Sequence, residues 1–255
     1  MAITQILHDS GILELVIDIP PVNAVDIAHL NELTDIVNSV NTRPEVHAIV
    51  LRSEGKGFVG GGDVKEVQRL DGHEGILGQA QGSCEVSVAL HECRAPVIVA
   101  VQRYCVGLGV LIVGSCDIVV ATHDAMFVLA EVDNGATGGA IQASGLMPDK
   151  RLRVAMLTCQ PVQAEELYRY GTIYRLVDES ELRSAAMEIA EVIAAKPPRV
   201  VRSAKQAING STGRNIRDLY RQELSYTYEL NLLGDASQAR DTFVNGTRKG
   251  YLSTS

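Results

Sequence analysis

The sequence of 255 residues is poor in aromatic side chains: it has no Trp, three Phe and eight Tyr. Its core must therefore be filled by aliphatic side chains, since protein interiors are close-packed. Apolar residues make up 46% of the chain and charged residues 21%, a balance typical of globular proteins. The length suffices for one large domain, or for one domain with a smaller attachment.

Long apolar runs and basic blocks are also missing. The longest apolar candidate, residues 110–121, is interrupted by Asp117, and a membrane span needs about 20 apolar residues. The N-terminal segment has no basic start and carries Asp9 and Glu14, so we expect no signal peptide. The net charge of −8 leaves no basic stretch that could follow a phosphate backbone. We therefore expect a cytoplasmic protein that binds neither membranes nor nucleic acids.

Three kinds of reactive motif are absent. The five cysteines form no CxxC pair and the six histidines no HxxxH pair. This pattern predicts reduced, buried thiols and no metal site. No G-x-S-x-G sequence occurs, so a serine-hydrolase triad has no anchor.

The first half of the chain alternates short β-branched runs with helical patterns. The predicted strands are 4–7, 11–19, 46–51, 97–101 and 118–121, and the predicted helices are 26–41, a helix from residue 63, and 77–93. Strands separated by helical crossovers predict parallel β-structure in an α/β fold. From about residue 180 only helices are predicted: 180–195, 199–209, 215–233 and 235–245. We expect this tail to serve packing or oligomerisation, not catalysis.

Two glycine-rich turns follow predicted strands and precede helices. They are EGKGFVGGGDVKE (54–66) and RYCVGLGV (103–110). Backbone amides at such turns can approach an anion closely, so two turns that meet would form an oxyanion hole. Neither turn has the spacing of a phosphate loop or a dinucleotide fingerprint. Read alone, each turn is also compatible with ordinary loop geometry, and Asp63 with a helix N-cap.

One carboxylate stands in an apolar segment. Glu131 ends the run MFVLAE (126–131). Burial there would raise the pKa of its carboxyl group and suit it to proton transfer. The alternative is a carboxylate that only begins a helix.

In their order along the chain, several segments resemble the crotonase (enoyl-CoA hydratase/isomerase) superfamily. They are PPVNAVD (20–26), EGKGFVGGGDVKEV (54–67), APVIVAVQRYCVGLG (95–109), CDIVVATHDAMFVLAEV (116–132), GTIYRLVDESEL (171–182) and AAKPPRVVRSAKQAIN (194–209). The resemblance implies an α/β fold, with a crotonase-like spiral of ββα turns over residues 1–190. It further implies a C-terminal helical region, 191–255, that forms homotrimers, often paired as hexamers.

The resemblance also implies a chemistry. The substrate would be an acyl-CoA thioester, with no cofactor besides this coenzyme A, and its thioester oxygen would be held by the amides of Gly62 and Leu108. The other implied positions are Lys56, Val59, Gly60, Gly61 and Lys65 for coenzyme A, Gly107 and Leu111 for the substrate pocket, and Glu131 with Asp63 for catalysis.

The chain departs from the superfamily pattern at three places. Leu111 stands where hydratases carry the first of two glutamates, and hydration uses both carboxylates. Leu108 interrupts a triple glycine: its amide still donates, but its side chain adds bulk beside the thioester. Gln102 and Arg103 replace an Asn-Gly pair, which would bring a positive charge near the site.

Three hypotheses follow. PPVNA, CVGLG, AEVDNGATGGA and YTYELNLLGDASQARDTFV resemble an actinobacterial branch that hydrolytically opens a ring of bicyclic CoA thioesters in steroid breakdown, and that branch also lacks the first glutamate. The first hypothesis is such a C–C hydrolase or a related lyase. The second is an enoyl-CoA hydratase or isomerase, since isomerisation needs one base. The third is a non-catalytic acyl-CoA binder, which Leu108, Leu111 and Ala130 favour; a nucleotide or RNA role is disfavoured by the acidic charge.

Overall fold

The computed structural model describes residues 2–70, 73–213 and 215–247. Its strands are β1 (Ile3–Leu7), β2 (Ile12–Ile17), β3 (Ala24–Val25), β4 (Ala48–Ser53), β5 (Gly61–Gly62), β6 (Val97–Val101), β7 (Tyr104–Val106), β8 (Ile118–Thr122), β9 (Met126–Val128), β10 (Val162–Gln163) and β11 (Arg175–Val177). Its helices are α1 (Ile27–Ser39), α2 (Val64–Arg69), α3 (Glu74–Glu92), α4 (Leu108–Ser115), α5 (Ala140–Ala143), α6 (Asp149–Thr158), α7 (Ala164–Arg169), α8 (Leu182–Ala194), α9 (Pro198–Ser211), α10 (Ile216–Leu233) and α11 (Asp235–Val244), with 3-10 turns η1 (Val40–Thr42), η2 (Val132–Asn134) and η3 (Glu179–Glu181).

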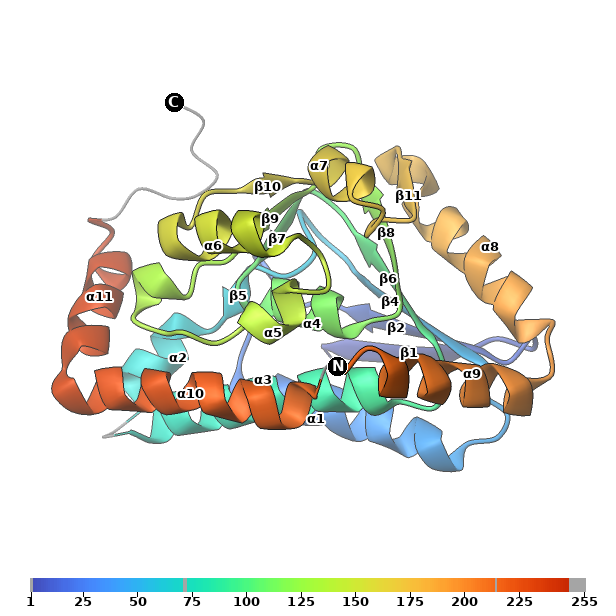
Figure 1. The fold of residues 1–255 in the computed structure, drawn as a ribbon, viewed down its shortest axis with the longest axis horizontal. Helices are drawn as coiled ribbons and strands as arrows, with labels where there is room; N and C mark the ends of the chain where they lie inside the picture. Colours follow the sequence, from blue (N-terminus) through green and yellow to red (C-terminus); the bar gives the residue numbers. More distant parts are fainter. Residues whose placement is uncertain (1, 71–72, 214, 248–255) are drawn as a thin grey trace.

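A six-stranded sheet organises the molecule, in the order β1-β2-β4-β6-β8-β11 (Figure 1). β1 pairs with β2 antiparallel, as expected of strands joined by a tight turn, and the remaining pairs are parallel. A second sheet contains β10, β9 and β7, and a short one contains β3 and β5. The predicted parallel α/β architecture is confirmed.

The two faces of the large sheet bury different sets of alternating residues. Leu13, Leu15 and Leu51 point into the main core, which includes residues of α1, α3 and α4. Ile12 and Val50 point to the other face, where α8 covers them (Figure 1). Neighbouring residues of a strand point to opposite faces, so both sides of these strands are apolar, which explains their continuous hydrophobic runs.

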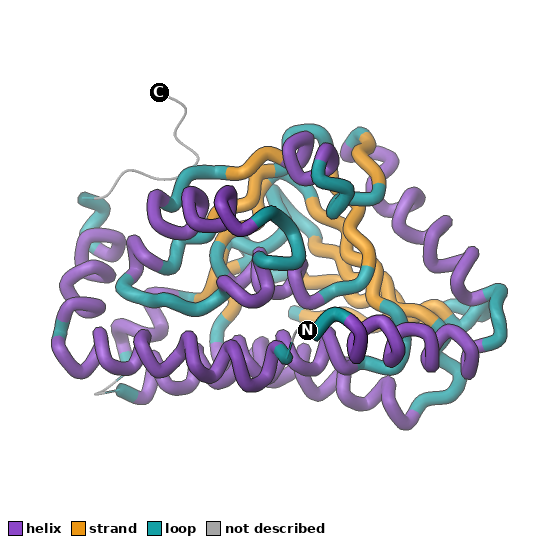
Figure 2. Tube along the Cα trace, in the orientation of Figure 1, coloured by secondary structure: helices purple, strands orange, loops and turns teal. Residues whose placement is uncertain are grey.

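The C-terminal helices pack against the rest of the molecule. The domain boundary expected at residue 190 falls inside α8, so the part that leaves the sheet begins with α9. α10 runs along α3 and α5, and α11 crosses to α2 and η2 (Figures 1 and 2). In α9, the buried ammonium of Lys205 donates to Asp117 (Nζ–Oδ2, 2.7 Å). The tail thus closes over the helical side of the core.

Most predicted elements are confirmed, but the middle of the chain was under-assigned. β9, β10 and α5–α7 lie in a region for which the patterns predicted no elements. These elements are short, and short segments have weak periodicity. All five cysteines are free thiols, as predicted, and Cys116 alone among them is only half-buried. Within the described ranges, no helix is both long and apolar enough to cross a bilayer.

Candidate active site

The two glycine-rich turns meet, as an oxyanion hole requires. Each continues from the carboxyl end of a parallel strand, β4 or β6. The Phe58 amide donates to the Tyr104 carbonyl (2.9 Å), and the Val106 amide donates to the Val59 carbonyl (2.9 Å). These bonds hold residues 58–62 beside residues 104–109, although more than 40 residues separate the two turns.

Gly107 and Leu108 form the second turn. Gly107 has φ +51° and precedes the first residue of α4, Leu108. The left-handed torsion therefore falls on the glycine, and leucine is compatible with its own place in the helix. No described residue accepts a hydrogen bond from the Leu108 amide, as expected for the first turn of a helix. Gly109 permits close approach, because a Cβ there would lie 3.0 Å from the Val59 carbonyl oxygen.

Gly62 lies at the end of the first turn. The next residue, Asp63, donates its amide to the Val25 carbonyl (2.9 Å) across the β3–β5 pair. Amides alternate in direction along an extended strand. We therefore infer that the Gly62 amide points away from β3.

A cavity of about 670 Å³ opens beside both turns. Its lining is mainly apolar and includes Leu108, Leu111 and Ala80. Among the described residues that line it, the acidic ones are Asp26, Asp63 and Glu131. Among the described residues, these three are the carboxylates placed to transfer a proton in this cavity.

Two of these carboxylates cap helices. Asp26 Oδ1 accepts from the amide (2.8 Å) and ring (2.7 Å) of His29 at the start of α1. Asp63 Oδ1 accepts from the amides of Lys65 (2.9 Å) and Glu66 (3.1 Å) at the start of α2. Asp63 therefore caps its helix and also lines the cavity; its catalytic role stays a prediction.

Glu131 is different. It begins η2 beside the second turn: its Oε1 lies 3.2 Å from where a Cβ on Gly107 would be. Its Oε2 is buried and has no hydrogen-bond partner among the described residues. Burial raises the pKa of its carboxyl group, the negative charge of Glu223 adds to the rise, and the pKa reaches about 8. Glu131 can thus exchange a proton near neutral pH.

A carboxylate from the tail shapes the cavity wall. Glu223 of α10 accepts from the amides of Gly139 (2.8 Å), Ala140 (3.0 Å) and Ile141 (2.8 Å). Thr137 donates its hydroxyl to the Glu223 carbonyl (2.7 Å). α10 therefore fixes residues 137–141, a loop whose Gly139 packs against Leu111.

The predicted residues differ in where the structure places them. Those that line the cavity are Gly60, Gly61, Gly62, Asp63, Lys65, Gly107, Leu108, Leu111 and Glu131. Lys56 is exposed and Val59 is buried in the core, and neither belongs to the lining. The expected charge near the site is not provided by Arg103, which is exposed and pairs with Glu179 (2.9 Å).

Sequence analysis missed the contribution of the tail. The residues that α10 and α11 place in the lining are Tyr220, Leu224, Thr227, Arg240 and Phe243. The tail thus forms part of the cavity wall, and the expectation that it takes no part in catalysis stays a prediction. The spacing of residues 220, 224 and 227 on one helical face was a usable signal. It could not show against which surface that face packs.

The sequence profile of a family described as enoyl-CoA hydratase/isomerase matches residues 8–248. The chain belongs to this family. As a crotonase-superfamily enzyme it shares its fold with an enoyl-CoA hydratase from Mycobacterium avium subsp. paratuberculosis, with a TM-score of 0.84 and 20% identity over 94% of this chain and 98% of the other.

Two relatives are more similar in sequence. Both are named (7aS)-7a-methyl-1,5-dioxo-2,3,5,6,7,7a-hexahydro-1H-indene-carboxyl-CoA hydrolase. The relative from Rhodococcus jostii is 41% identical over 96% of this chain and 95% of its own length. The relative from Mycobacterium tuberculosis is 39% identical over 96% of this chain and 99% of its own length. The crotonase spiral expected from the motifs is confirmed by these matches.

Proposed function

We propose that this enzyme hydrolyses a carbon–carbon bond in the ring of a bicyclic, keto-substituted carboxyl-CoA thioester. The observation that carries the proposal is the 41% identity, over nearly the whole of both chains, to a hydrolase whose name describes such a thioester. The carboxylate of Glu131 lies beside the second glycine turn, and its buried Oε2 has no hydrogen-bond partner among the described residues, which supports the proposal. Coenzyme A is part of the substrate, and no separate cofactor is needed.

The proposed reaction is a reverse Claisen cleavage. Water adds to a ring keto carbon, and the bond from that carbon to its ring neighbour breaks. The electron pair passes to the neighbour and is delocalised onto the thioester oxygen, which the amides of Gly62 and Leu108 stabilise. The keto carbon becomes a carboxylic acid, and the neighbour takes up a proton.

Glu131 moves the proton in this scheme. Ionised, it takes a proton from the attacking water; protonated, it returns that proton to carbon. Asp63, which also lines the cavity, assists in proton transfer. A carboxyl group with a pKa of about 8 is suited to both directions near neutral pH.

Leu111 argues against simple hydration. It is 3% exposed and packs in an apolar cluster with Tyr220 and Leu224. A hydratase places its first carboxylate at this position, and an apolar wall there offers nothing to orient a second proton transfer. The same apolar wall suits a hydrocarbon ring system.

We further propose that the protein is a cytoplasmic homotrimer, alone or paired as a hexamer. Exposed apolar residues on the tail, such as Leu232 and Leu233, support association. Sedimentation of the purified protein tests the stoichiometry.

Turnover tests the proposed reaction. The purified enzyme is given a bicyclic diketo-carboxyl-CoA thioester and, separately, crotonyl-CoA, and products are followed by mass spectrometry. We expect the bicyclic thioester to gain one water and lose one ring. We expect little conversion of crotonyl-CoA. Hydration of crotonyl-CoA with the ring substrate left intact contradicts the proposal.

A further inference from the structure

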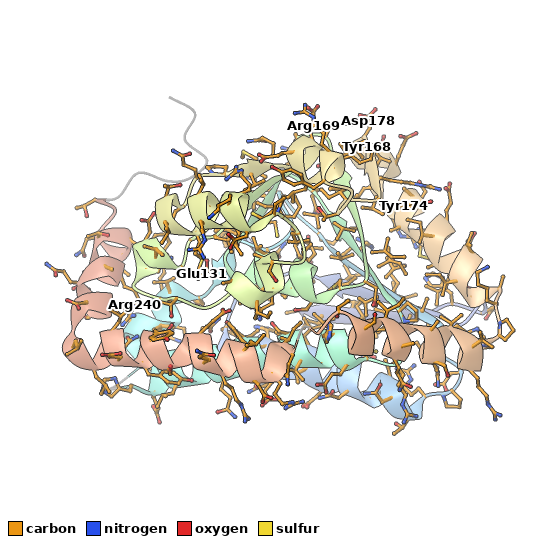
Figure 3. The ribbon with its side chains drawn as sticks, viewed as in Figure 1. Glu131, Tyr168, Arg169, Tyr174, Asp178 and Arg240 are labelled. Carbon is orange, nitrogen blue, oxygen red and sulfur yellow. The ribbon has the colours of Figure 1, made fainter. Side chains whose placement is uncertain are left out.

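A buried cation lines the cavity at its tail-covered side. Arg240 of α11 is 8% exposed, yet it belongs to the lining. Glu131 lines the same cavity, and Figure 3 shows both labelled residues on the α11 side of the molecule. Arg240 and the proposed catalytic residue therefore line one cavity.

The protein partners of Arg240 are neutral. Its Nε donates to Gln68 Oε1 (3.2 Å), and an Nη donates to Asn231 Oδ1 (2.9 Å). Its other terminal nitrogen, Nη1, is buried without a partner among the described residues. The negative charge of the neighbouring Asp241 acts on Arg240 without a direct contact. The Oδ1 of Asp241 accepts instead from the side-chain amide of Gln68 (2.6 Å). No described carboxylate forms an ion pair with Arg240.

A buried guanidinium with only neutral partners destabilises the protein. Burial lowers the pKa of Arg240, but a guanidinium stays protonated in proteins. A buried charge without a counter-charge is unfavourable, and an anionic oxygen at Nη1 would relieve that cost. Planar, two-pronged binding of a carboxylate is the interaction that arginine makes best.

We propose that Arg240 binds the carboxylate that the acyl group carries away from the thioester. This inference rests on the proposed function, because ring opening by water produces such a carboxylate from the attacked keto carbon. Before cleavage, Nη1 donates to the keto oxygen at the same place. Arg240 thereby orients the bond to be broken, while Gly62 and Leu108 hold the thioester at the other end.

The phosphates of coenzyme A are another source of anionic oxygen. Lys65 lines the cavity and is exposed, which fits a site for a hydrated, highly charged group. Arg240 is buried, and the same lining includes the apolar side chains of Val67 and Phe243. The surroundings of Arg240 therefore favour a carboxylate on an apolar acyl group.

Binding without turnover tests the assignment, so its outcome is independent of whether ring cleavage occurs. Calorimetric titration compares adipyl-CoA and suberyl-CoA with hexanoyl-CoA and octanoyl-CoA, which match them in length but lack the distal carboxylate, and with free coenzyme A. We expect the wild-type enzyme to prefer a dicarboxylic thioester by about tenfold or more, the range of a charge-assisted hydrogen bond. No preference overturns the assignment, whatever the variants do.

The variants sharpen the test. Arg240→Met removes the preference: it lowers the affinity for dicarboxylic thioesters by about 10–100-fold and that for the other ligands by less than about threefold. Arg240→Lys lowers the affinity for dicarboxylic thioesters less than Arg240→Met does. Equal weakening of all ligands, including free coenzyme A, overturns the assignment in favour of a phosphate contact. Gln68→Ala removes one protein partner of the guanidinium and keeps the charge, so the preference survives; its loss there overturns the assignment in favour of a structural role. Arg217→Gln, on the surface ion pair with Glu92, is the matched control without effect.

Discussion

Two glutamates of this protein hold buried carboxylate oxygens in opposite electrostatic settings. Glu14, on β2, is fully buried and accepts from Arg52 (2.6 Å), Arg183 (2.8 Å) and His8 (3.0 Å). The hydrogen bond from Arg183 is the largest cause that lowers the pKa of Glu14 to about 2. Glu131 has no cationic partner in the described structure, and burial raises its pKa to about 8.

Burial alone does not decide the protonation state of the two carboxyl groups. Desolvation opposes the charge of both carboxylates, but at Glu14 the donors from β4 and α8 outweigh it. That site ties α8 to the sheet and remains ionised at every physiological pH. At Glu131 nothing outweighs desolvation, so its proton is exchangeable. A buried carboxylate oxygen without a partner among the described residues, beside the unbonded amide at the start of α4, marks a candidate ligand site.

Removal of the Glu131 carboxylate has the largest expected effect on activity. We expect Glu131→Gln to lower kcat for ring opening by about 10²–10⁴-fold, the usual contribution of a positioned acid or base. Affinity for coenzyme A, measured by titration, stays the same. Glu179→Gln, on the exposed ion pair with Arg103, is the control. Unchanged turnover in Glu131→Gln removes this residue from the mechanism.

Removal of the Glu14 carboxylate gives the opposite result. We expect Glu14→Gln to lower the free energy of unfolding by roughly 3 kcal/mol, since it leaves Arg52 without its buried partner. Specific activity per folded molecule is preserved, because Glu14 does not line the cavity. Urea titration measures the first quantity and active-site titration the second. A stable but inactive variant contradicts the division between the two glutamates.

The two sites respond to pH in opposite directions. The pKa of Glu14 is lowered from 4.5 to about 2, so its stabilisation is present above pH 4.5 and lost as the pH falls through about 2. The pKa of Glu131 is raised, so its favourable contribution is complete below pH 4.5 and is lost as the pH rises through about 8. Relative to wild type, Glu131→Gln therefore gains stability as the pH rises. Urea titrations at several pH values check both signs, and parallel curves for wild type and both variants refute them.

Removal of the Glu223 charge has the smallest expected effect, a shift in the pH profile of activity. Its charge helps to raise the pKa of Glu131, so Glu223→Gln shifts the alkaline rise in kcat/KM to lower pH, by about one unit or less. The rise itself reports ionisation of Glu131 as the base. The glutamine retains an acceptor for the amides of residues 139–141. Thr137→Val, which loosens the same loop without a change of charge, serves as the control that leaves the inflection in place.

Local patterns predicted a large part of this structure. Apolar runs such as residues 97–101 are visible as strands because both faces of the sheet are covered, and the helices of the tail are long enough for their periodicity to show. The glycine turns and Glu131 were found as well, since each combines a chemical group with an unusual apolar setting. Arg240 and Glu223 were not found, because nothing around them in the sequence reveals that Arg240 is buried or that Glu223 accepts from the amides of residues 139–141.

The sequence by itself determined the parallel α/β fold, the two glycine-rich turns and the loss of a carboxylate at Leu111. These depend on residues close together in the chain, where period and backbone preference act directly. Only the tertiary structure decided that the two turns meet, that α10 and α11 wall the cavity, and that Glu131 and Arg240 share it. Burial and pairing depend on distant segments, so the same carboxylate or guanidinium can be a surface charge or a reactive group.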